Sequence, residues 1–141
     1  SEGKRILQDS FNVGTLRLLQ SQVSDDVWNS MKAAVKSSVK GVKNLVVIGS
    51  GGNINKLFSI SKTKDGKSLS MDQMDNYYKV MTNLSVIERM HEFNLRQERA
   101  EVIVPALQIY TSILKWSNVE SIEVPRIGLA DGLIRELYYN G

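Results

Sequence analysis

The sequence predicts a single α/β domain that is rich in helix and has only a few strands. Four apolar residues at 45–48 precede a glycine-rich turn and a helical pattern, which is the order of a strand–turn–helix unit. Elsewhere the apolar residues recur mainly at helical spacing. The length of 141 residues is close to the commonest size of one domain, so we assign residues 1–141 to a single domain.

The composition is that of an ordinary globular protein, with 42% hydrophobic and 23% charged residues. No run approaches the roughly 18 apolar residues that a membrane helix needs, so we expect no membrane partner and a cytoplasmic location. Cysteine is absent and His91 is the one histidine, which excludes disulfides, thiolate metal sites and imidazole clusters. The net charge of +3 is compatible with a polyanionic ligand. The lysines after the glycine turn lack interleaved aromatic residues, which argues against nucleic acid as a partner.

The first predicted element is a strand over residues 5–13, where Leu7, Phe11 and Val13 alternate and Gly14 ends the run. No hairpin partner adjoins this strand, so we expect it to belong to a larger sheet. A helix is then predicted after residue 24, a serine that suits the N-cap position. The expected buried stripe of this helix comprises Val27, Met31, Ala34, Val35, Ser38 and Val42.

The middle of the chain is predicted to alternate between strand and helix. Residues 45–48 lack alternation, which predicts a central strand covered on both faces. A helix is expected from Ile54, after the glycine turn. Ser70 and Gln73 form a capping box for another helix, and a short helix is predicted to follow Ser85.

The most apolar predicted helix follows residue 94. Asn94 and Gln97 are interpreted as its capping box, and two adjacent apolar stripes indicate that it is largely buried. Pro105 lies inside this pattern, so we expect a kink or a fresh helix start there.

The C-terminal part is predicted to hold one strand and one helix. Residues 121–127 predict the strand, and Pro125 places it at a sheet edge or marks its end. A last helix is expected from Ala130 to about Tyr139. The predicted strands are too few to close a sheet by themselves.

The glycine turn is the strongest candidate for a binding site. Glycines after a strand let a ligand approach the backbone closely, and the N–H groups and dipole of the next helix favour an anion. The alternative is a tight connection that needs glycine for steric reasons and binds nothing. A dinucleotide fingerprint fails because residue 54 is isoleucine, and a P-loop fails because Lys56 lacks the required Gly-Lys-Ser/Thr context. The candidate phosphate-binding residues are Gly49, Ser50, Gly51, Gly52 and Asn53.

Four segments, in order along the chain, resemble motifs of the exopolyphosphatase/guanosine pentaphosphate phosphohydrolase (Ppx/GppA) family. Residues 12–18 resemble its (L/I)-G-x-x-R-L segment, and residues 47–57 resemble its second glycine motif. Residues 98–103 are similar to its E-R-A-x-x-I segment, and residues 128–134 are similar to its closing G-L-R-E-G motif. One departure is Asn53, where the family commonly has threonine.

The resemblance implies both a fold and a chemistry. It implies an incomplete RNase H-like domain of the actin/Hsp70/sugar kinase superfamily, corresponding to the C-terminal part of the family's second domain. Such enzymes use Mg²⁺ to remove terminal phosphate from polyphosphate or guanosine pentaphosphate, with a glutamate of the first domain as general base. The first domain is missing here, so we expect no catalytic residue, no bound metal and no activity in this chain alone.

The resemblance also places Arg17 and Arg99 near the phosphate. Arg99 opens the apolar helix, where its guanidinium could reach an anion; the alternative is a surface ion pair with Glu98 or Glu101.

Two other functions stay open on the sequence. One is a non-catalytic module that binds phosphate or nucleotide. The other is a structural or dimerisation domain, in which the buried helix and the faces of Trp28 and Trp116 pack on a partner such as a second copy of the chain.

Overall fold

The computed structural model describes residues 9–12, 25–61, 68–124 and 137–140. The predicted site residue Arg17 and Pro125 lie outside these ranges. None of the described helices is long and apolar enough to cross a membrane.

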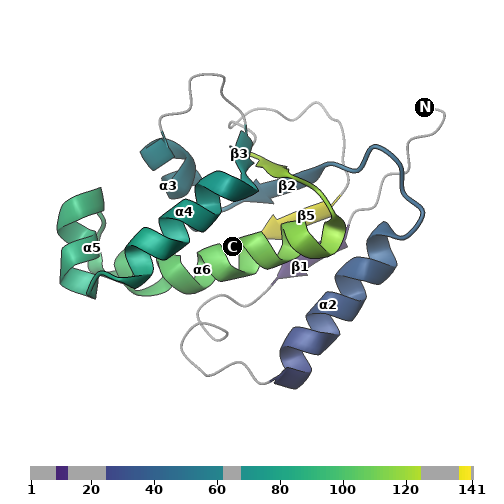
Figure 1. Cartoon of the computed structure of the whole chain (residues 1–141), viewed down its shortest axis with the longest axis horizontal. Coiled ribbons are helices and arrows are strands. Elements are labelled where there is room, and N and C mark those ends of the chain that lie inside the picture. Colours follow the sequence, from purple (N-terminus) through teal and green to yellow (C-terminus); the bar gives the residue numbers. More distant parts are fainter. Residues whose placement is uncertain (1–8, 13–24, 62–67, 125–136, 141) are drawn as a thin grey trace.

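The described residues form a five-stranded sheet (Figure 1). Its strands are β1 (Asp9–Asn12), β2 (Val47–Ser50), β3 (Ser68–Ser70), β4 (Ser121–Glu123) and β5 (Leu137–Asn140). They lie in the order β1-β5-β2-β4-β3. The central strand β2 pairs in parallel with both β5 and β4, which aligns Val47 with Leu137 and with Ile122. The expectation of a central strand at 45–48 is therefore confirmed, two residues later than predicted.

The C-terminal strand corrects one prediction and completes the sheet. The prediction of a helix as far as Tyr139 is wrong at its C-terminal end, because Leu137–Asn140 forms β5 between β1 and β2. Hydrogen bonding to a strand on each side outweighs a local helical pattern, and adjacent tyrosines suit a strand. The predicted strands were expected to be too few for a sheet by themselves, and the sheet does include two further strands, β5 and β3, of which β5 joins β1 to β2. In addition, β4 lies between β2 and β3, so the strand near Pro125 is not at an edge.

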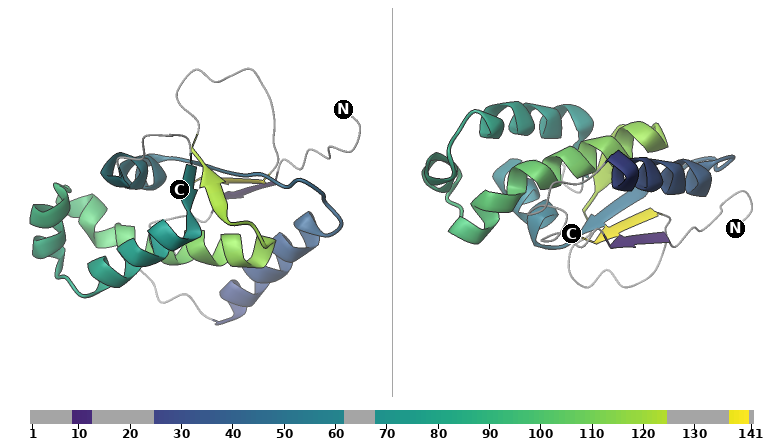
Figure 2. Two further views of the ribbon diagram at one scale, coloured as in Figure 1. Left: turned by 45° about the horizontal axis from the view of Figure 1, so that its top comes forward. Right: turned by 90° about the horizontal axis from the view of Figure 1, so that it is seen from below.

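Helices α2 (Asp25–Val39), α4 (Met71–Thr82) and α6 (Gln97–Ser117) lie on the same side of the sheet (Figures 1 and 2). α3 (Gly52–Ser61) follows β2 directly, and α5 (Val86–Phe93) connects α4 to α6. The expected burial of α6 is confirmed. The helix runs unbroken through its internal proline, so no fresh helix starts there. Its buried residues include Ile103, Ala106, Leu107, Tyr110, Ile113 and Leu114.

The packing of α2 differs in part from the predicted stripe. Val35 is fully buried, but Ala34 is exposed, so the predicted burial of Ala34 is wrong. Trp28 meets Trp116 of α6 edge to face, with ring centroids 5.7 Å apart. The two rings that the dimerisation alternative assigned to a partner thus pack on each other.

The helix ends show which capping signals the chain uses. The box at the start of α4 is confirmed: the Ser70 hydroxyl accepts from the Gln73 backbone N–H at 3.1 Å, and the Gln73 side chain accepts from the Ser70 N–H at 2.9 Å. The box predicted at Asn94 and Gln97 is wrong. Asn94 instead ends α5 in the left-handed conformation, which asparagine adopts more readily than most residues. The N-cap residue of α6 is Arg96, which has no side-chain acceptor to offer.

Arg89 of α5 joins three helices. Its Nε donates to the Met81 carbonyl at the end of α4 at 2.8 Å, and its Nη1 donates to the Ala100 carbonyl in α6 at 2.9 Å. Tyr77 of α4 also packs edge to face on Phe93 of α5, and burial raises the pKa of the Tyr77 hydroxyl above its ordinary value. These contacts fix the start of α6 relative to α4.

Gly49 is required by the packing of β2. A Cβ at this position would lie 2.6 Å from Ile122 Cδ1 and 3.2 Å from Ile54 Cγ1. Ile122 and Ile54 are both fully buried, so neither side chain has room to move away.

We expect Gly49→Ala to lower the free energy of unfolding by about 1–3 kcal/mol, the usual cost of overpacking a core. Adding Ile122→Val, which removes the methyl group nearest the new Cβ, should restore part of this loss. Urea unfolding of Gly49→Ala, Ile122→Val and the double variant against the wild type checks the prediction. If Gly49→Ala is as stable as the wild type, the steric role of Gly49 is wrong.

We expect Arg89→Ala to lower the free energy of unfolding by about 1–3 kcal/mol, because two carbonyls lose a charged donor. Arg96→Ala is the matched control, since Arg96 is exposed and should change stability by less than about 0.5 kcal/mol. Equal unfolding midpoints for the two variants would contradict the proposed link between α4, α5 and α6.

Candidate anion-binding site

The glycine turn connects the end of β2 to the start of α3. Gly51 has a φ of +115°, which a residue with a side chain rarely adopts. Its carbonyl accepts from the Asn55 backbone N–H at 3.1 Å, and this bond closes the first turn of α3. The backbone N–H groups of a first helical turn have no partner within their own helix and carry the positive end of its dipole.

The start of α6 lies beside the start of α3. Leu95 is buried and Arg96 is extended, and these residues lead from α5 into the first turn of α6. The backbone N–H groups of Arg99 and Ala100 both donate to the Arg96 carbonyl. No side chain of the described residues caps this turn, so a second positive helix end reaches the same region.

Arg99 makes the contact between the two helix ends. Its Nη1 donates to Asn53 Oδ1 at 2.7 Å, and Asn53 is only 2% exposed. A Cβ at Gly52 would overlap Arg99 Nη2 and lie 2.9 Å from Arg99 Cζ. The guanidinium therefore packs against the backbone of Gly52, in space that any larger residue would occupy. Among the described residues Arg99 forms no ion pair, so the alternative of a pairing with a neighbouring glutamate is absent from that part of the chain.

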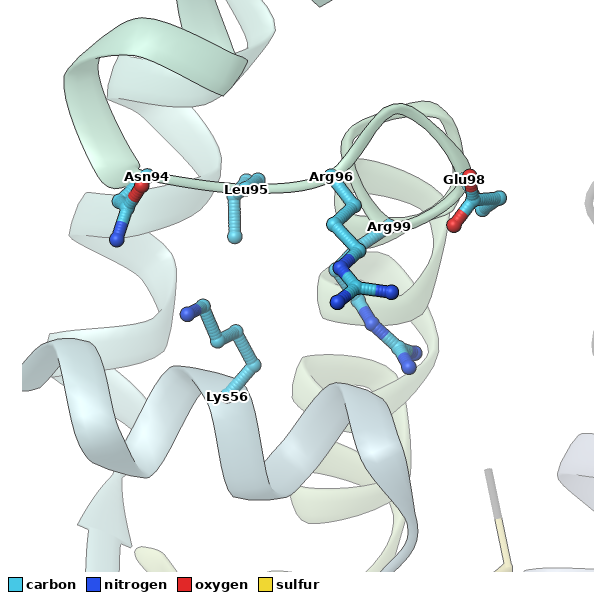
Figure 3. Close-up of a pocket in the computed structure, with 6 residues that line it drawn as sticks. All are labelled: Lys56, Asn94, Leu95, Arg96, Glu98 and Arg99. Carbon is cyan, nitrogen blue, oxygen red and sulfur yellow. The ribbon is translucent and has the colours of Figure 1, made fainter.

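A cavity of about 510 Å³ opens beside this contact. Figure 3 shows Lys56 rising from α3 toward Leu95, while Arg96 and Arg99 extend from the α6 side toward α3. The lining carries three cations and one carboxylate, that of Glu98. Together with the two helix ends, these charges make the cavity a region of positive potential that favours an anionic ligand.

The predicted site residues fall into three groups. Gly52, Asn53 and Arg99 lie together at the start of α3. Gly49 is buried against β4, Gly51 shapes the turn, and Ser50 ends β2. Arg17 lies outside the described residues.

Two lining cations were not predicted. Lys56 stands four residues after Gly52, and Arg96 stands three residues before Arg99. Residues at these spacings share one helix face. The spacing of Lys56 from Gly52, and that of Arg96 from Arg99, would therefore have predicted both cations.

In the described part of the chain, no three His, Asp or Glu residues gather into a group that could hold a metal ion. These residues thus offer no all-protein cage for the implied Mg²⁺, which usually takes one or two carboxylates together with substrate phosphates and water.

Comparisons with known proteins give a match in structure alone. No family model matches the sequence, and no curated protein matches it. The fold is similar to that of the Ppx/GppA phosphatase of Aquifex aeolicus, with a TM-score of 0.51 and 19% identity over 72% of this chain and 37% of that one. It is also similar to an exopolyphosphatase of Cytophaga hutchinsonii, with a TM-score of 0.53 and 18% identity over 81% of this chain and 44% of that one.

The chain thus spans less than half the length of the solved proteins that it resembles. At this identity the likeness shows the fold, which is that of a portion of the Ppx/GppA phosphatase structures.

Proposed function

We propose that this chain is the part of a phosphoanhydride hydrolase that holds the phosphates of its substrate, inorganic polyphosphate or guanosine pentaphosphate. One observation carries the proposal: Arg99 lies against Gly52 where two helix N-termini meet, beside a cavity that two further cations line. The likeness to phosphatase structures supports the same class of ligand.

The site suits a phosphate group because it offers donors of two kinds. The backbone N–H groups at the start of α3 can donate to phosphate oxygens, as helix N-termini do for many anions. Arg99 has further N–H groups besides the one that Asn53 accepts, and charge-assisted bonds to phosphate are among the strongest in proteins. Lys56 and Arg96 add charge that would neutralise neighbouring phosphates of a chain.

The remaining parts of the proposed enzyme would come from a longer protein. In this proposal the sheet belongs to an RNase H-like domain, and a first domain supplies the glutamate that acts as general base. The Mg²⁺ ligands would come from elsewhere in the longer protein. The protein would act in the cytoplasm.

We expect Arg99→Ala to weaken the binding of inorganic triphosphate at least about tenfold, because a charge-assisted bond contributes about 1.5–3 kcal/mol. Isothermal titration calorimetry of the 141-residue chain at low salt measures the affinity.

The matched control is Lys115→Ala, which removes the same charge from the other end of α6. Sixteen residues separate the two positions, so Lys115 is about 24 Å away along the helix. Equal losses in both variants would mean that only net charge matters. No binding by the wild type at millimolar triphosphate would overturn the proposed site.

We expect the chain alone to release no phosphate from polyphosphate in the presence of Mg²⁺, since positioning without a base or a held metal does not complete the reaction. A colorimetric phosphate assay checks this. Release that Gly51→Asp abolishes would contradict the expectation. Binding without hydrolysis by the longer protein would favour the non-catalytic alternative.

A further inference from the structure

We infer that Asn53 is a positioning residue: it orients the Arg99 guanidinium over Gly52 and makes no contact with the bound anion itself. The inference rests on the proposed function, since it assigns a role within the same site. It separates Asn53 from the other residues of the glycine turn, which are all predicted to bind phosphate directly.

Burial is the first reason. Asn53 is 2% exposed, whereas Gly52 beside it is exposed and Lys56 on the next turn is partly exposed. A side chain that an incoming phosphate contacts needs an open path, and the Asn53 side chain has almost no accessible surface.

The direction of the hydrogen bond is the second reason. The bond joins Arg99 Nη1 to Asn53 Oδ1 at 2.7 Å, so the amide oxygen accepts from the guanidinium. An amide oxygen attracts a cation and repels a phosphate oxygen. The atom of Asn53 that faces Arg99 is therefore suited to hold the cation and unsuited to bind the anion.

The geometry at Gly52 is the third reason. The guanidinium lies so close to Gly52 that a Cβ there would overlap it. Arginine side chains have many rotamers, and a buried acceptor at one edge of the group selects the one that covers the start of α3. With its rotamer already selected, Arg99 loses less conformational entropy when an anion binds.

The consequence is that Asn53 acts on anion binding only through Arg99. We expect Asn53→Ala to weaken triphosphate binding about threefold to tenfold, because ordering of the long side chain then occurs in the binding step. In the Arg99→Ala background the same substitution should change the affinity less than about twofold. If Asn53 contacted the anion directly, its substitution would weaken the binding by the same factor in both backgrounds.

A second variant moves Arg99 without changing Asn53. Gly52 does not have a positive φ, so alanine there adds no backbone strain. Its new methyl group would displace the flexible end of Arg99, and the loss in the free energy of unfolding should not exceed the roughly 1–3 kcal/mol of leaving the buried Asn53 oxygen without a donor. We therefore expect weaker triphosphate binding from a protein that still unfolds in one cooperative transition.

The experiment is a double-mutant cycle of Asn53→Ala and Arg99→Ala, read by calorimetry with inorganic triphosphate, together with NMR of the Arg99 guanidinium N–H signals. A held guanidinium gives slowly exchanging signals in the wild type. These signals should be lost in Asn53→Ala and retained in Asn53→Asp, which keeps an acceptor oxygen at the same reach.

The outcomes distinguish this inference from the proposed function. If the wild type binds triphosphate, and Asn53→Ala weakens this binding equally in the wild-type and Arg99→Ala backgrounds, the positioning role is wrong and the proposed function still holds. Guanidinium signals that persist in Asn53→Ala overturn the positioning role as well. If the wild type binds no triphosphate, the proposed function fails together with any role of Asn53 in it, and the NMR signals then report only a structural contact.

Discussion

The burial of α6 against the sheet is the constraint on which the rest of the structure depends. Every other described helix packs against α6, and its buried residues span the helix from Ala100 to Ser117. A helix held along its whole length cannot shift its first turn independently. The place of Arg99, one residue before the first buried position, is thus set by core packing, and the contact with α3 follows from it.

Each of the three glycines of the turn is needed for a different physical reason. Gly49 leaves room for Ile122, Gly51 supplies a positive φ, and Gly52 leaves room for the guanidinium of Arg99. The first two are explained by steric needs of the fold and would be required of a turn that binds nothing. Only Gly52 leaves space that a charged side chain fills. A glycine-rich turn is therefore weaker support for a phosphate site than the cation that packs on it.

Local signals in the sequence predicted local structure, and non-local pairing caused most of the errors. The capping box at Ser70 and the apolar run of β2 involve neighbouring residues, so their patterns are visible in the sequence. The strand at Leu137–Asn140 is defined by partners more than 85 positions away in the chain, at β1 and β2, and no local pattern specifies them. Asn94 shows a subtler case, because the same residue type suits both the end of one helix and the start of the next. The site was predictable where it follows the turn, and the spacing of Lys56 from Gly52 within α3 would have added this lysine. Arg96, by contrast, becomes a neighbour of the turn only through the packing of α6 beside α3.

The fold and the charges are two independent lines of support for the site. At 17–19% identity the structural likeness shows a shared backbone arrangement, and it carries no information about which side chains line the cavity. The cations belong to this chain, and their electrostatic energies follow from their own positions. A guanidinium at the positive end of a helix is placed against the dipole, where a cation loses about 0.3–1 kcal/mol instead of gaining it. One amide oxygen offsets part of this cost. A bound phosphate changes the sign of this contribution, because the helix end and the guanidinium then both attract the same anion. The arrangement of the two positive groups is therefore unfavourable without an anion and favourable with one.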